Sequence, residues 1–244
     1  MTFRPAFHFE RKRSFMRFSA YELNGSPGLG VESGDAWRGL RAGDAGFPGT
    51  LESLIMSGGD ALAAAGRKLA AAPEIRISSV KLMPPLSHPE KVICVGLNYR
   101  DHSAESGFKQ PDFPALFGRF NSSLIGHGAS ILRPEQSVQL DYEGELVAVI
   151  GKTARAVSEP DGLDYVMGNS IFNDGSILSS FLTLKPGDVM VTGTPSGAGM
   201  ARQPQLFMKH GDRCEVEIEK IGVLSNPVRD RKQLQEGRPS RSKT

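Results

Sequence analysis

Short apolar runs separated by turn-forming residues are the feature that most limits how this chain can fold. From residue 92 onward, runs such as ELVAVIGK (145–152) and CEVEIEKIGVLSNPV (214–228) are bounded or interrupted by Gly, Pro, Asn or Asp. Runs of this length with such boundaries are typical of β-strands. The same pattern predicts strands at SSLIGHG (122–128) and DVMVTGTP (188–195). The larger part of the chain is therefore predicted to be mostly β, within an α+β fold class.

The sequence divides into five segments. Residues 16–80 combine strand-like pieces (MRFSAYEL, GLGVES) with an alanine-rich stretch that favours helix, and they predict a small N-terminal α+β lobe. Residues 81–90 are rich in proline and predict a linker, and residues 91–228 form the main β domain. Residues 1–15 and 229–244 are basic segments, which we expect to be solvated and mobile.

Charge and composition exclude several classes of function. The formal net charge is +2, and no stripe of Arg and Lys interleaved with aromatic residues occurs in the body, so no nucleic-acid partner is expected. No apolar run approaches the roughly 18 residues of a membrane span, and no apolar signal segment opens the chain. Cys94 and Cys214 both lie in apolar runs and are predicted to be buried thiols, because a disulfide framework needs more cysteines. These features predict a cytoplasmic protein without a membrane partner.

Two carboxylates stand at the head of an apolar run, in DYEGELVAVIG (141–151). Side chains alternate across a strand, so Glu143 and Glu145 share one face, and Gly144 leaves the other face open. Like charges at this spacing repel, so either a cation lies between them or the face is fully hydrated. Asp174 ends the apolar strand NSIFN, and carboxylates at strand ends suit Mg²⁺, Mn²⁺ or Ca²⁺ better than zinc. From spacing alone, an Asp174 that merely caps a turn explains the pattern equally well.

A histidine and a carboxylate lie three residues apart in GLNYRDHSAESG (96–107). Asp101 is a predicted N-cap of a short helical turn, on which His102 and Glu105 would be neighbours. A carboxylate that orients an imidazole gives the general base that proton transfer near neutral pH requires. From these residues alone, a solvated surface pair is the more common arrangement.

A glycine-rich segment, TGTPSGAG (192–199), follows the predicted strand at 188–191. Its amide groups and threonine hydroxyls are suited to hold a carboxylate or carbonyl oxygen, which makes Gly193 and Thr194 candidate substrate contacts. It is not a phosphate-binding loop, because the required glycine spacing and lysine are absent.

Taken in order, these blocks resemble the fumarylacetoacetate hydrolase family. The matching stretches span about residues 91–228 and are VGLNYRDHSAESG, P-x-L-F-x-R-F-x-S-S-L-I-G-H-G, LDYEGELVAVIGK, YVMGNSIFND, LKPGDVMVTGTPSGAGM and GDRCEVEIEKIGVLSNPV. The resemblance implies a mixed β-sandwich roll with a small N-terminal lobe, a homodimer, and Mg²⁺ or Mn²⁺ at the active site, with Ca²⁺ as a substitute. The residue roles that it implies are metal ligands at Glu143, Glu145 and Asp174, a catalytic dyad of His102 and Glu105 on a lid, and substrate contacts at Tyr99, Gly193 and Thr194.

The resemblance also implies a class of reaction. Family substrates are small keto and diketo acids whose enolate is stabilised by the metal. Hydrolysis of a C–C bond in an acylpyruvate or fumarylpyruvate, as in the catabolism of aromatic compounds, is the first prediction. Oxaloacetate decarboxylase and 2-hydroxyhepta-2,4-diene-1,7-dioate isomerase activities stay open on the same scaffold, as does a non-catalytic ligand-binding relative.

One stretch departs from the family pattern. Relatives have several tens of residues after the aspartate block, including an Arg and a Lys that contact substrate oxygens, whereas here FNDGSI is followed almost directly by LSSFLTLKPGD. Either the stretch is deleted, or a mobile loop is missing from the sequence between Ile177 and Leu178. The missing loop is favoured, because flexible loops are common near active sites and a deletion would remove oxyanion-stabilising groups. An uninterrupted chain at this point would favour the non-catalytic relative.

Overall fold

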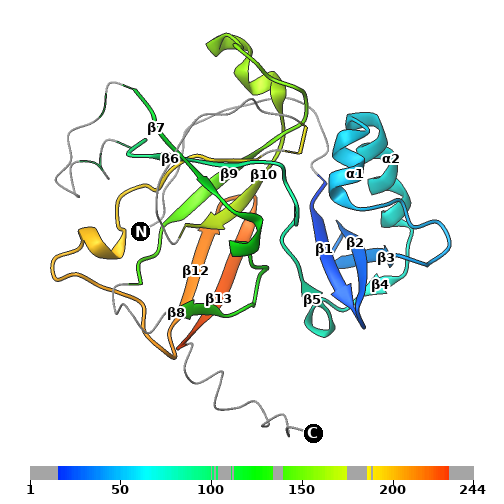
Figure 1. The fold of residues 1–244 in the computed structure, drawn as a ribbon. Coiled ribbons are helices and arrows are strands. Elements are labelled where there is room, and N and C mark those ends of the chain that lie inside the picture. The colour runs from blue at the N-terminus through cyan, green and yellow to red at the C-terminus, as the bar shows by residue number, and fades with distance from the viewer. Residues whose placement is uncertain are drawn as a thin grey trace, which may run out of the picture.

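The computed structural model describes residues 16–99, 101, 103, 111, 113–133, 140–174, 186–187 and 189–230. The described part is mostly β, with a small N-terminal lobe beside a larger β lobe (Figure 1). The predicted α+β, mostly β fold class is therefore confirmed. None of the helices in this part of the chain is long and apolar enough to cross a membrane.

The N-terminal lobe is built on an antiparallel sheet covered by two helices. In sheet order its strands are β4 (Glu74–Ile75), β3 (Ala36–Arg41), β2 (Ser26–Ser33), β1 (Phe18–Leu23) and β5 (Lys81–Leu82). The strands predicted from MRFSAYEL and GLGVES correspond to β1 and β2. The first two residues of the predicted linker form β5 and pair with β1, so this sheet continues beyond residue 80.

The alanine-rich stretch forms two helices, α1 (Leu51–Met56) and α2 (Gly59–Ala70). Thr50 begins α1, because its hydroxyl accepts a hydrogen bond from the Ser53 amide at 3.3 Å. Gly58 separates the helices with a φ of 95°, a left-handed conformation that favours glycine. Leu54 on α1 packs in the core of this lobe, whereas Ile55 packs in the core of the β lobe, so α1 joins the two lobes.

The larger lobe contains two sheets. The five-stranded sheet has the order β10 (Val166–Asn173), β9 (Gly144–Ile150), β11 (Val189–Val191), β6 (Val92–Gly96) and β7 (Ala115–Arg119). The three-stranded sheet has the order β12 (Arg213–Ile218), β13 (Gly222–Asp230) and β8 (Ile131–Arg133). Strand β11 pairs parallel to β6 and antiparallel to β9, so the five-stranded sheet is mixed. Four 3₁₀ segments complete the elements assigned in the described residues: η1 (Ile77–Ser79), η2 (Asn121–Ser123), η3 (Glu159–Tyr165) and η4 (Gly199–Ala201).

The two sheets meet where β9 begins. A Cβ on Gly144 would lie 2.9 Å from a methyl carbon of Val216 on β12, so only glycine fits here without a shift. The face that we expected Gly144 to leave open is therefore filled by the second sheet. This packing fixes the start of β9, on which the paired carboxylates lie.

The predicted strand at SSLIGHG is wrong. Residues 121–123 form η2, and the chain then runs past the linker, where a Cβ on Gly126 would lie 2.1 Å from the Leu82 carbonyl oxygen. The amide of Asn226 donates to the carbonyl oxygens of Gly126 and Ala129, at 3.0 and 2.9 Å. A side chain satisfies these backbone groups, so they need no neighbouring strand.

Candidate active site

The structure brings the predicted carboxylates to the neighbouring ends of β9 and β10. Glu143 directly precedes β9, Glu145 lies within it, and Asp174 directly follows β10. The Asp174 amide donates to the Glu143 carbonyl oxygen at 2.8 Å, which holds the two chain segments together. Glu145 and Asp174 are 3% and 1% exposed, so neither carboxylate is hydrated at the surface.

Glu145 is held by the glycine-rich segment after β11. The Gly193 amide donates to one of its oxygens at 2.7 Å, and the Thr194 hydroxyl donates to the other at 3.2 Å. Gly193 has a φ of 94°, and a Cβ there would lie 2.6 Å from the Val95 carbonyl oxygen and 3.7 Å from the Tyr99 ring. Tyr99 thus lies against this segment. The donors that we expected to contact a substrate hold Glu145 in this structure, and the substrate roles of Tyr99, Gly193 and Thr194 stay predictions.

Burial raises the pKa of both glutamates. The pKa of Glu143 rises to about 7, first because of desolvation and then because of repulsion from Asp174 and Asp141. Desolvation raises the pKa of Glu145 to about 8, although its hydrogen bond from Gly193 opposes the rise. The repulsion inferred from the sequence is thus present, and a cation close to these carboxylates would relieve it.

A cation that the sequence reasoning missed does reach Asp174. The guanidinium of Arg119, at the end of β7, donates from Nη2 to Asp174 Oδ1. The Arg119 guanidinium also lies 5.5 Å from the centre of the Phe117 ring, and its side chain is only 14% exposed. Arg119 is part of the P-x-L-F-x-R-F block. Its ion pair with Asp174 could not be predicted from the sequence, because the two residues are 55 positions apart.

The thiol of Cys94 on β6 lies in the same buried region. Burial, and then the charge of Asp174, raise its pKa well above the usual range of a thiol. A protonated buried thiol is a poor nucleophile, and Cys94 packs in the core of the β lobe. Both cysteines are free, and Cys214 is half-buried rather than buried as expected.

The carboxylates fit a divalent cation in chemistry but only partly in position. All three offer hard oxygen donors, and Asp174 Oδ2 is buried without a hydrogen-bond partner among the described residues, which suits a metal ligand. However, no three His, Cys, Asp or Glu side chains in the described segments lie close enough together to hold a metal ion. Arg119 engages one oxygen of Asp174, and Gly193 and Thr194 engage Glu145. These contacts use donor oxygens that a cation at the same carboxylates would need.

The predicted dyad, His102 and Glu105, lies outside the described residues. Asp101 and Ser103 are both helical, and the Ser103 amide donates to the Tyr99 carbonyl oxygen at 3.0 Å. The described part of the predicted turn is therefore helical, and the rest of the turn lies outside the described residues. Asp101 lies within it rather than at its N-cap, because the helical hydrogen bond already begins at Tyr99.

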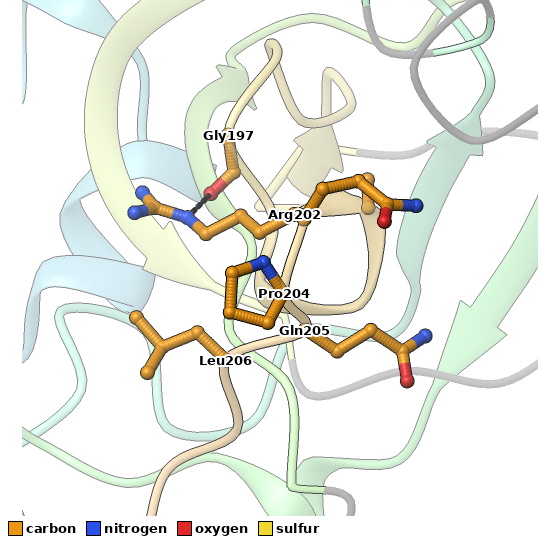
Figure 2. Close-up of a pocket in the computed structure, with 7 residues that line it drawn as sticks. Gly197, Arg202, Pro204, Gln205 and Leu206 are labelled. Carbon is orange, nitrogen blue, oxygen red and sulfur yellow. Dashed lines mark hydrogen bonds between the residues drawn. The ribbon is translucent and has the colours of Figure 1, made fainter.

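A pocket of about 770 Å³ lies in the loop that follows the glycine-rich segment (Figure 2), and its lining includes none of the three predicted carboxylates. Arg202 crosses it, and its Nε donates to the Gly197 carbonyl oxygen at 3.0 Å. Its guanidinium lies 5.8 Å from the centre of the Tyr142 ring, and Tyr142 directly precedes Glu143. The volume is within the range of sites for small metabolites. The sequence reasoning did not identify this loop.

Comparison with known proteins identifies the family. The model for the fumarylacetoacetate (FAA) hydrolase C-terminal domain matches residues 91–178 and 176–229. The chain belongs to the fumarylacetoacetate hydrolase family. It is 31% identical to oxaloacetate tautomerase Fahd2a, mitochondrial, of Rattus norvegicus and 30% identical to FAHD2A of Homo sapiens. Each alignment covers 89% of this chain and 92% of the relative.

Solved structures of the family have the same fold. Fumarylacetoacetate hydrolase from Exiguobacterium antarcticum matches with a TM-score of 0.69 at 27% identity, over 89% of this chain and all of that one. Maleylpyruvate hydrolase from Sphingobium sp. SYK-6, in complex with manganese (II) ion and pyruvate, also matches with a TM-score of 0.69. It is 22% identical, covering 88% of this chain and 99% of that one, so this second match concerns the fold alone.

The comparison also corrects one expectation. The sequence runs without interruption from Ile177 to Leu178, so the interpretation that a mobile loop had been left out of the sequence is wrong. The rat alignment spans 289 positions, whereas 89% of the 244 residues is about 217, so roughly 70 positions of the relative have no counterpart here. The two matches to the family model meet at residues 176–178, which places the deletion directly after Asp174.

Proposed function

We propose that this protein catalyses the keto–enol tautomerisation of a small 2-keto dicarboxylic acid, with oxaloacetate as the test substrate. The buried carboxylates Glu145 and Asp174, close together at the ends of β9 and β10, are the observation that carries this proposal. Burial and the repulsion from neighbouring carboxylates raise the pKa of Glu145, and a divalent cation held by these carboxylates would favour their ionised forms. The names of the rat and human relatives support oxaloacetate as the test substrate.

Each group has a definite role in this proposal. Glu143, Glu145 and Asp174 would hold Mg²⁺ or Mn²⁺, and the cation would polarise the keto oxygen of the substrate. Gly193 and Thr194 keep the Glu145 carboxylate in place. His102, oriented by Glu105, would move a proton between the carbon beside the keto group and the keto oxygen.

Tautomerisation has fewer chemical requirements than the C–C hydrolysis that the family resemblance first suggested. Tautomerisation takes one proton from carbon and returns one to oxygen, without a water molecule and without breaking a bond between carbons. Hydrolysis also needs a positioned water and groups that stabilise the departing carbanion, each typically worth about 100-fold or more in rate. The Arg- and Lys-bearing stretch expected to contact substrate oxygens is absent here, so the reaction with fewer requirements is preferred.

A non-catalytic ligand-binding relative is the second candidate, and the uninterrupted chain between Ile177 and Leu178 is the observation that favours it. Such a protein would bind a keto acid at the same carboxylates without turning it over. The homodimer and the cytoplasmic location stay predictions in either case.

One set of measurements separates the two candidates. Ketonisation of enol-oxaloacetate, pyruvate formation from oxaloacetate and hydrolysis of an acylpyruvate should be followed with Mg²⁺ and with Mn²⁺, beside a thermal-shift measurement of oxaloacetate binding. We expect ketonisation well above the buffer rate, lost in Glu145→Gln and kept in the exposed-strand control Glu217→Gln. Binding without any rate enhancement would establish the second candidate, and the absence of both would contradict the two together.

A further inference from the structure

Among the described residues of the β lobe, the best-buried ion pair joins Arg119 to Asp174. Asp174 is 1% exposed, and one of its oxygens is bound by the Arg119 guanidinium while Oδ2 has no partner among the described residues. Arg119 Nε is likewise buried without a partner in the described segments. An ionised carboxylate at this depth requires a positive charge beside it, and here a side chain provides that charge.

The same carboxylate is the candidate ligand of a divalent cation. A cation on Asp174 would place a double positive charge next to the guanidinium that already contacts this group, and like charges this close repel strongly. In the structure the guanidinium contacts this carboxylate, and no three potential metal ligands among the described residues lie at coordinating distance. The Arg119 guanidinium and a divalent cation would thus bind the same carboxylate.

We propose that Arg119 is a built-in counter-ion of Asp174 that competes with a divalent cation for this carboxylate. Without metal, Arg119 neutralises Asp174 and keeps the strand ends together. When a cation binds, Arg119 leaves Asp174 and its guanidinium becomes available to an anion in the site. The inference rests on the metal site of the proposed function, but it concerns affinity and not turnover.

The test measures Mn²⁺ binding by calorimetry on the full chain after treatment with EDTA and its removal. Arg119→Gln should bind Mn²⁺ at least about tenfold more tightly than the wild type, the size expected for coupled charges in contact. Arg133→Gln is the matched control. Arg133 forms an ion pair with Asp230, with 2.7 Å between Nε and Oδ1, and this pair lies away from the site. It should leave the affinity unchanged, whereas Asp174→Asn should abolish binding.

A measurement on the wild type covers the case in which Arg119→Gln does not fold. With ¹⁵N-labelled arginine, the Nε signal of Arg119 should shift when Mg²⁺ is added, while the signal of Arg133 stays in place. An unchanged Arg119 signal at saturating Mg²⁺ would overturn the inference.

The remaining outcomes separate this inference from the proposed function. If Arg119→Gln binds Mn²⁺ equally or more weakly while Asp174→Asn loses binding, then Arg119 supports the metal ligand and the competition is refuted, with the metal site intact. If no protein binds Mn²⁺, the metal site and the inference fail together. Tighter binding by Arg119→Gln without tautomerase activity in the wild type would uphold the inference and contradict the proposed function.

Discussion

The raised pKa of Glu145 leads to a specific dependence of stability on pH. A carboxyl group whose pKa is higher in the folded protein than in the unfolded chain binds more protons when folded. The contribution of Glu145 to the free energy of unfolding should therefore be greatest at low pH and fall as the pH rises from the unfolded value of 4.5 towards the folded value of about 8. Replacing Glu145 by Gln keeps the size of the side chain and removes the ionisation, so this fall should diminish.

The expected size of the effect follows from the pKa. Each pH unit between the two values costs about 1.4 kcal/mol, so ionising Glu145 between pH 5 and pH 8 costs about 3 kcal/mol. Urea unfolding at pH 5, 6, 7 and 8 in EDTA should show this loss in the wild type. Glu145→Gln should lose less and become the more stable protein near pH 8.

Two comparisons make the experiment decisive. Glu217→Gln changes an exposed carboxylate on β12 and should follow the wild-type profile. Added Mn²⁺ should reduce the pH dependence of the wild type, because a bound cation favours the ionised carboxylates. Parallel profiles for the wild type and Glu145→Gln in EDTA would refute the reasoning, since a group that does not change its pKa on folding adds no slope.

Three further predictions concern packing, catalysis and assembly. Gly144→Ala should destabilise the fold by about 1–3 kcal/mol in urea unfolding, because its methyl group would meet Val216. Gly168→Ala on β10 is the control, because the space around Gly168 is open and the change should not be destabilising. Equal effects of the two changes would contradict the packing argument. His102→Ala should lower kcat for ketonisation by about 10²–10⁴-fold with little change in Mn²⁺ affinity, and Glu105→Gln should fall between it and the wild type. Retention of more than about a tenth of the rate in His102→Ala would exclude the dyad. Light scattering should report a two-fold dimer, and a mass of 26.3 kDa at micromolar concentration would count against it.

Much of the fold and of the acidic site was predictable from local pattern. Alternation and turn residues are short-range properties, so they located β1, β2, β9 and the run that contains β12 and β13. They also placed Glu143 and Glu145 at the head of a strand and Asp174 at the end of another. The same patterns wrongly predicted a strand at residues 122–128. Its backbone groups are satisfied by the side chain of Asn226, almost a hundred residues further along the chain.

The charge balance of the site was decided by tertiary structure alone. Strands β7 and β10 are the opposite edges of a five-stranded sheet, about 19 Å apart if the sheet were flat, with strands about 4.8 Å apart. Nothing local in the sequence indicates that Arg119 on one edge and Asp174 beyond the other make contact. Sequence patterns determine which residues lie on strands and which carboxylates repel, because these depend on near neighbours. The cation that offsets the repulsion, Arg119, reaches Asp174 only because the sheet folds over itself, and this contact exists only in the assembled core.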